Sequence, residues 1–135
     1  MWECPVCNRQ FQKNKQSHMC VVKDPGELFE GRPDYMVMAF GHLMDVVMGW
    51  QPGTMGASVH TIIFTNKKAW LIVKPMKKEL DIKFYHKEEL EHELFKKVTH
   101  YNNKYAYHIR VKWEEELTEE LFELLRMGYD YGMTS

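Results

Sequence analysis

The sequence predicts an α+β fold, in which a small N-terminal zinc finger precedes a four-stranded antiparallel sheet packed against two or three helices. Within residues 57–113, apolar and polar side chains alternate along short runs, which is typical of strands with one solvated face. Apolar residues at helical spacing lie on both sides of this region, in 33–50 and 118–129. Strands grouped between helices favour a sheet with its helices on one face. The three cysteines all lie near the N-terminus and predict a separate small unit.

The cysteines and one histidine predict a tetrahedral zinc site with the ligands Cys4, Cys7, His18 and Cys20. Structural zinc takes four thiolate or imidazole ligands, and a Cys-x-x-Cys turn aims two sulfurs at one point. Pro5 fixes its own φ and stiffens that turn. A unit as small as residues 1–22 cannot bury enough apolar surface by itself, so the metal would supply much of its folding free energy. Four protein ligands leave no position for water, which argues against catalysis by this Zn²⁺.

Two other uses of the cysteines remain open. A disulfide would pair two of the cysteines and leave one over. Because the sequence shows no signal peptide, we expect the chain to be cytoplasmic, and disulfides are rare in the cytoplasm. Cys4 and Cys7 could instead form a redox pair, but such motifs usually open a helix after a strand, and no strand is evident before them. Bound Zn²⁺ is therefore the expectation.

The body of the chain, residues 23–135, is expected to begin with a linker and a long helix. Asp24-Pro25-Gly26 is a turn signal within the linker. A helix is expected over 33–50, because Pro33 suits a first helical turn and apolar residues then recur in steps of four and three. Such a stripe is most simply a helix face buried in the core. The stripe consists of Met36, Phe40, Leu43, Val47 and Trp50.

Four strands are expected in the sheet. The first two, VHTIIF at 59–64 and AWLIVK at 69–74, are separated by four residues, a length that suits a hairpin. The third contains Leu80, Ile82 and Phe84 alternating with polar neighbours, and the fourth, at 105–112, alternates in the same way.

Two more helices complete the prediction. Residues 88–97 carry apolar side chains at helical spacing on one side and could form a short helix. The final helix is expected over 118–129, with Thr118 as its N-cap and acidic residues in its first turn, where negative charge is favourable.

The charge distribution limits the classes of partner. The net charge of −1 argues against strong global attraction to nucleic acid. The finger is nevertheless faintly basic, because Arg9, Lys13 and Lys15 outnumber its single acid, Glu3. The sequence contains no run of eighteen or more apolar residues, which a transmembrane helix would need, so no membrane association is expected.

The solvated face of the predicted sheet suggests a nucleic-acid surface. Single strands bind platforms that combine aromatic rings, on which bases stack, with cations that pair phosphates. An ordinary solvated sheet face explains the same polar residues equally well. The residues of this predicted platform are Lys83, Tyr85, His108, Arg110 and Lys112.

An enzymatic alternative centres on His100, which precedes the last strand and could bind a ligand or act as a base. A loop histidine bonded to the backbone is the simpler interpretation. The sequence contains no P-loop, dinucleotide-binding glycine motif, His-Glu-x-x-His motif or nucleophile elbow. The absence of such motifs favours a non-enzymatic protein.

Three features of the body match one known family, namely Leu28-Phe29-Glu30-Gly31, Val98-Thr99-His100 and a closing helix with Leu121, Leu124, Leu125 and Tyr129. With these features the chain resembles the domain of unknown function 5655 family over nearly its whole length. Some relatives carry a similar finger, although Asn8 replaces their usual glycine after the second cysteine. The resemblance implies no assigned activity. Related domains are sometimes fused to nuclease-like domains, which associates the family with nucleic acid.

These observations predict a zinc-binding, non-enzymatic interaction module that contacts nucleic acid or a protein partner. The finger cations would supply phosphate contacts in the first case, while the near-zero net charge keeps a protein partner open. The alternative is an enzyme or small-molecule-binding domain with a site near His100 and a purely structural finger.

Overall fold

The computed structural model describes residues 2–3, 10–11, 25–101 and 103–134. Near the N-terminus, β1 (Trp2–Glu3) pairs antiparallel with β2 (Gln10–Phe11). From residue 25 the chain forms a short 3-10 helix (Pro25–Phe29), helix α1 (Asp34–Val47), six strands, a 3-10 turn (Glu114–Glu116) and helix α2 (Glu119–Gly132). The six strands are β3 (Thr54–Ala57), β4 (Ile62–Thr65), β5 (Ala69–Pro75), β6 (Leu80–His86), β7 (Phe95–His100) and β8 (Tyr105–Val111).

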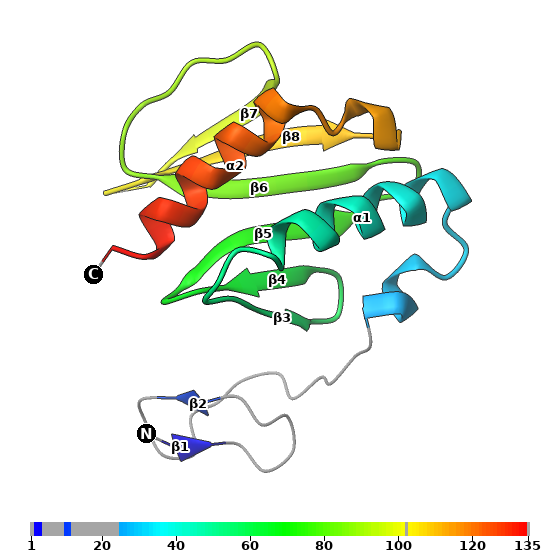
Figure 1. The fold of residues 1–135 in the computed structure, drawn as a ribbon, viewed down its shortest axis with the longest axis horizontal. Helices are drawn as coiled ribbons and strands as arrows, with labels where there is room; N and C mark the ends of the chain where they lie inside the picture. Colours follow the sequence, from blue (N-terminus) through cyan, green and yellow to red (C-terminus); the bar gives the residue numbers. More distant parts are fainter. Residues whose placement is uncertain (1, 4–9, 12–24, 102, 135) are drawn as a thin grey trace.

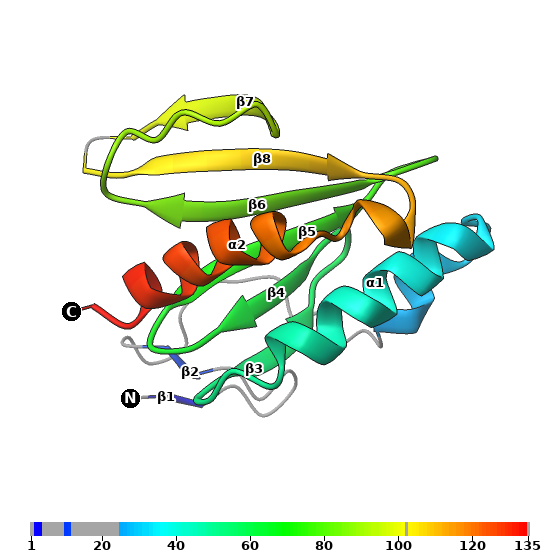
Figure 2. The same ribbon diagram turned by 45° about the horizontal axis from the view of Figure 1, so that its top comes forward.

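The six strands form one antiparallel sheet in the order β3-β4-β5-β6-β8-β7. Both helices lie on the same face of this sheet (Figure 1). Helix α2 packs on β5 and β6, and α1 lies over the side of the sheet that contains β4, as the tilted view also shows (Figure 2). The domain is therefore α+β, as predicted, with two layers and one sheet face that no described helix covers.

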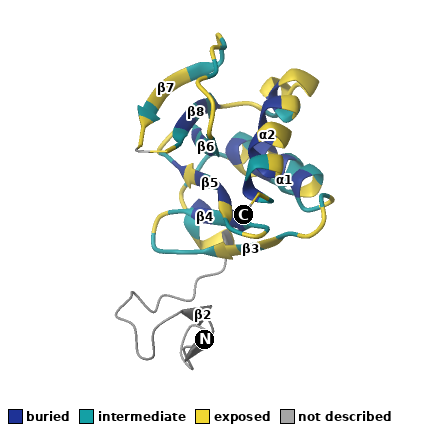
Figure 3. Ribbon diagram, turned by 90° about the vertical axis from the view of Figure 1, so that its left-hand side faces the viewer, coloured by how far each residue is buried: buried dark blue, intermediate teal, exposed yellow. Residues whose placement is uncertain are grey.

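The hydrophobic core lies between the helices and the sheet, where the buried residues gather (Figure 3). Alternation along each strand sends one set of side chains into this layer and the other to the open face. Strand β7 is mostly exposed, because it lies at the sheet edge. The largest fully buried side chains are Trp70, Tyr107, Phe64, Phe84, Met36, Leu43, Ile62, Leu71, Leu80, Ile82, Ile109 and Leu121.

The two predicted long helices are confirmed. Helix α1 lies within the predicted range 33–50, with Pro33 at its N-cap. Helix α2 begins after Thr118, whose hydroxyl accepts a hydrogen bond from the Leu121 backbone N–H at 3.3 Å, and it continues beyond the predicted end to Gly132. No described helix is both long and apolar enough to span a membrane.

The predicted number of strands was wrong, because the sheet has six strands and not four. Strand β3 was missed: Gly56 and Ala57 give it little β-forming character, and its burial alternates only weakly. The first predicted strand also starts at Ile62 instead of Val59, since residues 58–61 form a turn closed by Ser58 N–H and Thr61 C=O.

The predicted helix at 88–97 was also wrong, because residues 87–94 form a loop and Phe95 begins strand β7. A buried tyrosine explains the loop. The Tyr107 hydroxyl accepts a hydrogen bond from Leu90 N–H at 2.6 Å and donates one to the Glu88 carbonyl at 2.7 Å. These bonds hold the backbone in an extended path across the sheet, and tertiary contacts thereby override a weak helical pattern. Burial also raises the pKa of the Tyr107 hydroxyl above its ordinary value.

Tyr107→Phe is expected to lower the free energy of unfolding by about 1–2 kcal/mol, because it removes both bonds and leaves a partly buried N–H unpaired. Urea denaturation measures this loss. Amide exchange at Leu90 should accelerate in the variant, while exchange at Ile82 in the sheet centre should change only as much as global stability does. Unchanged protection at Leu90 would show that the hydroxyl does not hold the loop.

Candidate functional site

The open face of the sheet brings together residues from neighbouring strands. Strands β6 and β8 are paired so that Lys83 lies opposite His108 and Asp81 lies opposite Arg110. Alternation places these four side chains on the face away from the helices, since their neighbours Ile82 and Ile109 are buried in the core. The strand pairing therefore determines which polar groups meet.

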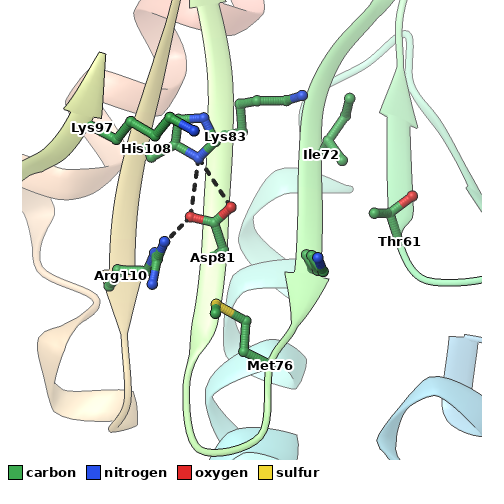
Figure 4. Close-up of a pocket in the computed structure, with 9 residues that line it drawn as sticks. Thr61, Ile72, Met76, Asp81, Lys83, Lys97, His108 and Arg110 are labelled. Atoms are coloured by element: carbon green, nitrogen blue, oxygen red, sulfur yellow. Dashed lines mark hydrogen bonds and ion pairs between the residues drawn. The ribbon is translucent and has the colours of Figure 1, made fainter. Parts of the chain in front are cut away.

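Asp81 is the centre of this arrangement (Figure 4). Its two carboxylate oxygens lie 3.1 and 3.0 Å from Nδ1 of His108, and Oδ1 accepts a hydrogen bond from Nε of Arg110 at 2.8 Å. The side chains of Asp81 and His108 are each only 13% exposed, and that of Arg110 is 32% exposed. Charge-assisted bonds in such a partly buried setting are stronger than those between neutral groups, so Asp81 fixes the orientation of both partners.

A shallow depression of about 320 Å³ surrounds this cluster, and we call it the basic depression. Four of its lining residues are cationic and only Asp81 is acidic. Among the described residues, no carboxylate forms an ion pair with Lys74, Lys83 or Lys97. The region therefore carries a local positive charge despite the overall charge of −1. Its lining residues are Thr61, Ile72, Lys74, Met76, Asp81, Lys83, Lys97, His108 and Arg110.

Two tyrosines adjoin the basic depression, and we call them the tyrosine pair. The rings of Tyr85 and Tyr101 are 6.4 Å apart between centroids, and Tyr101 is 43% exposed. Lys83 Nζ lies 5.4 Å from the Tyr85 ring centroid, so it connects the pair with the depression. Lys104 Nζ lies 4.2 Å from the same centroid. Cations next to aromatic rings suit a ligand that has both phosphates and flat bases.

The structure groups most, but not all, of the residues predicted for a nucleic-acid platform. Lys83, His108 and Arg110 line the basic depression, and Tyr85 adjoins it. Lys112 is exposed just beyond the end of β8 and is not among the lining residues.

Asp81, Lys74 and Lys97 were missed as site residues. The signal available in the sequence for Asp81 was its alternation with Leu80 and Ile82, which places it on the same face as Lys83. Lys74 and Lys97 could be assigned only from the strand order, because β5 and β7 lie on opposite sides of the β6-β8 pair.

His100 lies apart from the basic depression. It is the last residue of β7, and its exposed ring stacks on Tyr105 with centroids 4.4 Å apart. His100 pairs with Tyr105 in the sheet. Because side chains alternate along β7, His100 lies on the same face as Val98 and on the face opposite to Lys97. The structure therefore does not join His100 to the cluster around Asp81.

The predicted zinc ligands lie outside the described residues, as do the finger cations Arg9, Lys13 and Lys15. The structure describes only the paired strands on either side of residues 4–9. Within the described part of the chain, no group of three or more His, Cys, Asp and Glu side chains could hold a metal ion.

Comparison with protein families identifies the body of the chain. Residues 25–132 match a family described as a domain of unknown function, DUF5655. The chain belongs to this family. The matched range runs from the first 3-10 helix to the end of α2, so the DUF5655 domain includes the whole six-stranded sheet and the basic depression. No curated protein and no solved structure matches the chain.

Proposed function

We propose that this DUF5655 protein is a non-enzymatic module that binds single-stranded nucleic acid through the open face of its sheet. The observation that carries the proposal is the basic depression, which is lined by Lys74, Lys83, Lys97 and Arg110 and contains a single acid, Asp81. Each cation can neutralise a phosphate and release a counterion, and the adjoining tyrosine pair offers rings to bases. An unwound strand suits this face, because its bases are free to stack.

Salt-dependent binding tests the proposal directly. Labelled single-stranded DNA and RNA and their duplexes are titrated with the full chain at several salt concentrations, with fluorescence anisotropy as the readout. Arg110 is paired with Asp81, so the three lysines of the depression are the cations expected to release counterions. Contacts with about three phosphates predict a slope of roughly −2 for log K against log salt with single strands. The absence of single-strand binding at low salt would reject the proposal, and a protein partner with an acidic surface would then become the leading candidate for these cations.

The proposed N-terminal finger would contribute a bound Zn²⁺ and further phosphate contacts. Three thiolates and one imidazole, from Cys4, Cys7, His18 and Cys20, are a donor set that suits structural zinc. The antiparallel pairing of β1 with β2 supports this, because it places Glu3 opposite Gln10, and these two residues flank the stretch of sequence that contains Cys4 and Cys7. In this proposal the metal folds the finger and takes no part in chemistry.

One zinc ion per chain is therefore expected, and Cys4→Ser should abolish stoichiometric binding, because a hydroxyl is a far poorer ligand than a thiolate. Elemental analysis of dialysed protein measures the metal. The thermal transition of the DUF5655 domain should remain in the variant, since the domain has its own core. Metal-free wild-type protein, purified with zinc present throughout, would contradict the assignment.

The bond between Asp81 and His108 supports a second candidate function. A carboxylate at Nδ1 fixes the imidazole tautomer and makes Nε2 available as a base, as hydrolases require. No described residue forms a hydrogen bond with Nε2. Incubating labelled strands with wild-type protein and with His108→Asn decides between the two functions. Strand cleavage that the variant loses would replace the binding proposal with an enzyme centred on His108, whereas intact strands support binding alone.

A further inference from the structure

The positive charge of the open face is concentrated at one place. The four cations of the basic depression come from four different strands, namely β5, β6, β7 and β8, and they converge on a volume of about 320 Å³. A continuous strand of nucleic acid is usually followed by a groove of cations along its backbone. Here the depression is at the lower end of the size range of small-molecule sites. Its dimensions therefore suit one nucleotide better than a long stretch of backbone.

Asp81 orients Arg110 as a donor to a compact anion. Both of its oxygens face His108 Nδ1, and Oδ1 also holds Arg110 Nε. With Nε fixed, the plane of the guanidinium is fixed, and the structure shows no described partner for its two terminal nitrogens. Such an oriented guanidinium can donate two parallel hydrogen bonds to one phosphate. Asp81 therefore positions the terminal nitrogens of Arg110 as donors, and its own charge is offset by that of Arg110.

We propose that the basic depression recognises a phosphate monoester at the end of a nucleic-acid strand. This inference rests on the function proposed above and names the part of the strand that is read. A terminal phosphate carries a charge of about −1.5 to −2 at pH 7 and has three acceptor oxygens, whereas an internal phosphodiester carries one charge. The charge of Arg110 is offset by that of Asp81, so the positive charges that remain in the depression are those of Lys74, Lys83 and Lys97. Three such charges match the more highly charged terminal phosphate.

The tyrosine pair gives the bound strand a direction. Tyr85 is two residues beyond Lys83 on the same face of β6, which is about 7 Å along the strand. A terminal phosphate beside Lys83 would therefore place the first base near Tyr85 and Tyr101. Lys104 lies 4.2 Å from the Tyr85 centroid and 6.0 Å from the Tyr101 centroid, where it could meet the next phosphate.

Three strands of the same sequence, about ten nucleotides long, test the proposal. One has a 5′-phosphate, one a 3′-phosphate, and one hydroxyl groups at both ends. With the full, zinc-supplemented chain, we expect one phosphorylated strand to bind at least about tenfold more tightly than the hydroxyl strand, a difference of about 1.4 kcal/mol. The 5′ and 3′ forms show which end is recognised. Equal binding of all three strands would overturn end recognition and leave strand binding intact, while no binding of any strand would reject both proposals.

Variants then assign the preference to the depression. Arg110→Lys keeps the charge but loses the bidentate geometry, and Lys97→Gln removes an exposed cation that forms no ion pair with a described residue, so it should fold normally. Both should reduce the preference for the phosphorylated strand severalfold. Lys87→Gln, an exposed cation outside the depression, is the matched control and should preserve the preference. A preference that survives in both Arg110→Lys and Lys97→Gln would place end recognition elsewhere and overturn the assignment.

Discussion

Replacing Phe84 by alanine is expected to lower the free energy of unfolding by about 3–5 kcal/mol. The ring is fully buried in the central strand β6, and its centroid lies 5.5 Å from that of Tyr107 and 6.0 Å from that of Phe95. Above it, Gly128 lets helix α2 come close to the sheet, since a Cβ at that position would lie 2.8 Å from Phe84 Cδ2. The ring thus joins the helix to three strands, and its loss would leave a large cavity. Denaturant unfolding at constant m-value measures the change.

A double-mutant cycle separates this contact from a general loss of core. Gly128→Leu alone should destabilise the fold by about 1–3 kcal/mol because the leucine would collide with the ring. In the Phe84→Ala background the same leucine fills the cavity, so the double variant should be more stable than the sum of the singles predicts by about 1 kcal/mol or more. Gly41→Leu is the matched control, because a Cβ at Gly41 has no atom within 4 Å. Strictly additive losses would show that Phe84 and Gly128 do not share one contact.

The sequence predicted the fold where local pattern and tertiary structure agree. Strand β8 was predicted almost to the residue, because Tyr105, Tyr107, Ile109 and Val111 alternate without interruption and face the core. Helix α2 was predicted because its apolar spacing is accompanied by a real N-cap at Thr118. In both cases a short window of sequence contains the physical cause.

The sequence failed where the cause is not local. Strand β7 pairs through a register shift between Phe95 and Lys97, which interrupts the period of two. Its apolar residues then match helical spacing with Leu90 and Leu94 by coincidence. The loop that replaces the predicted helix depends on Tyr107, which is distant in sequence. No local window contains that information.

The candidate site shows the same division. Lys83, Tyr85, His108 and Arg110 could be assigned to one face by alternation alone. Their convergence around Asp81 could not, because it depends on the register that places Asp81 opposite Arg110. The contribution of Lys97 depends further on β7 pairing with β8 at the sheet edge. The composition also gave no indication of the site, because the net charge of −1 sums the positive charge of the depression with negative charge elsewhere in the chain.

Replacing Lys83, Lys97 and Arg110 together by glutamate is expected to weaken single-strand binding by at least about 100-fold at low salt. Three cations that would pair with phosphates become three anions that repel them. Each lost contact reduces the magnitude of the slope of log K against log salt by about 0.7, so binding by the variant should depend only weakly on salt. Arg110→Glu also places a carboxylate next to Asp81, whose bond to Arg110 Nε is lost. A second triple variant with glutamine at the same positions avoids this repulsion and should still weaken binding by roughly tenfold or more. Circular dichroism establishes that both variants are folded.

Lys112→Glu is the control that distinguishes the basic depression from the face in general. Lys112 is exposed and lies just past the end of β8, outside the depression. If phosphate contacts are confined to the depression, this charge reversal should weaken binding only about twofold, through long-range electrostatics that salt screens. If instead Lys112→Glu were as damaging as the triple variants, the strand would extend along β8 beyond the depression. Wild-type affinity in both triple variants would mean that the open sheet face does not bind the strand, and the cations of the finger would then be the next to test.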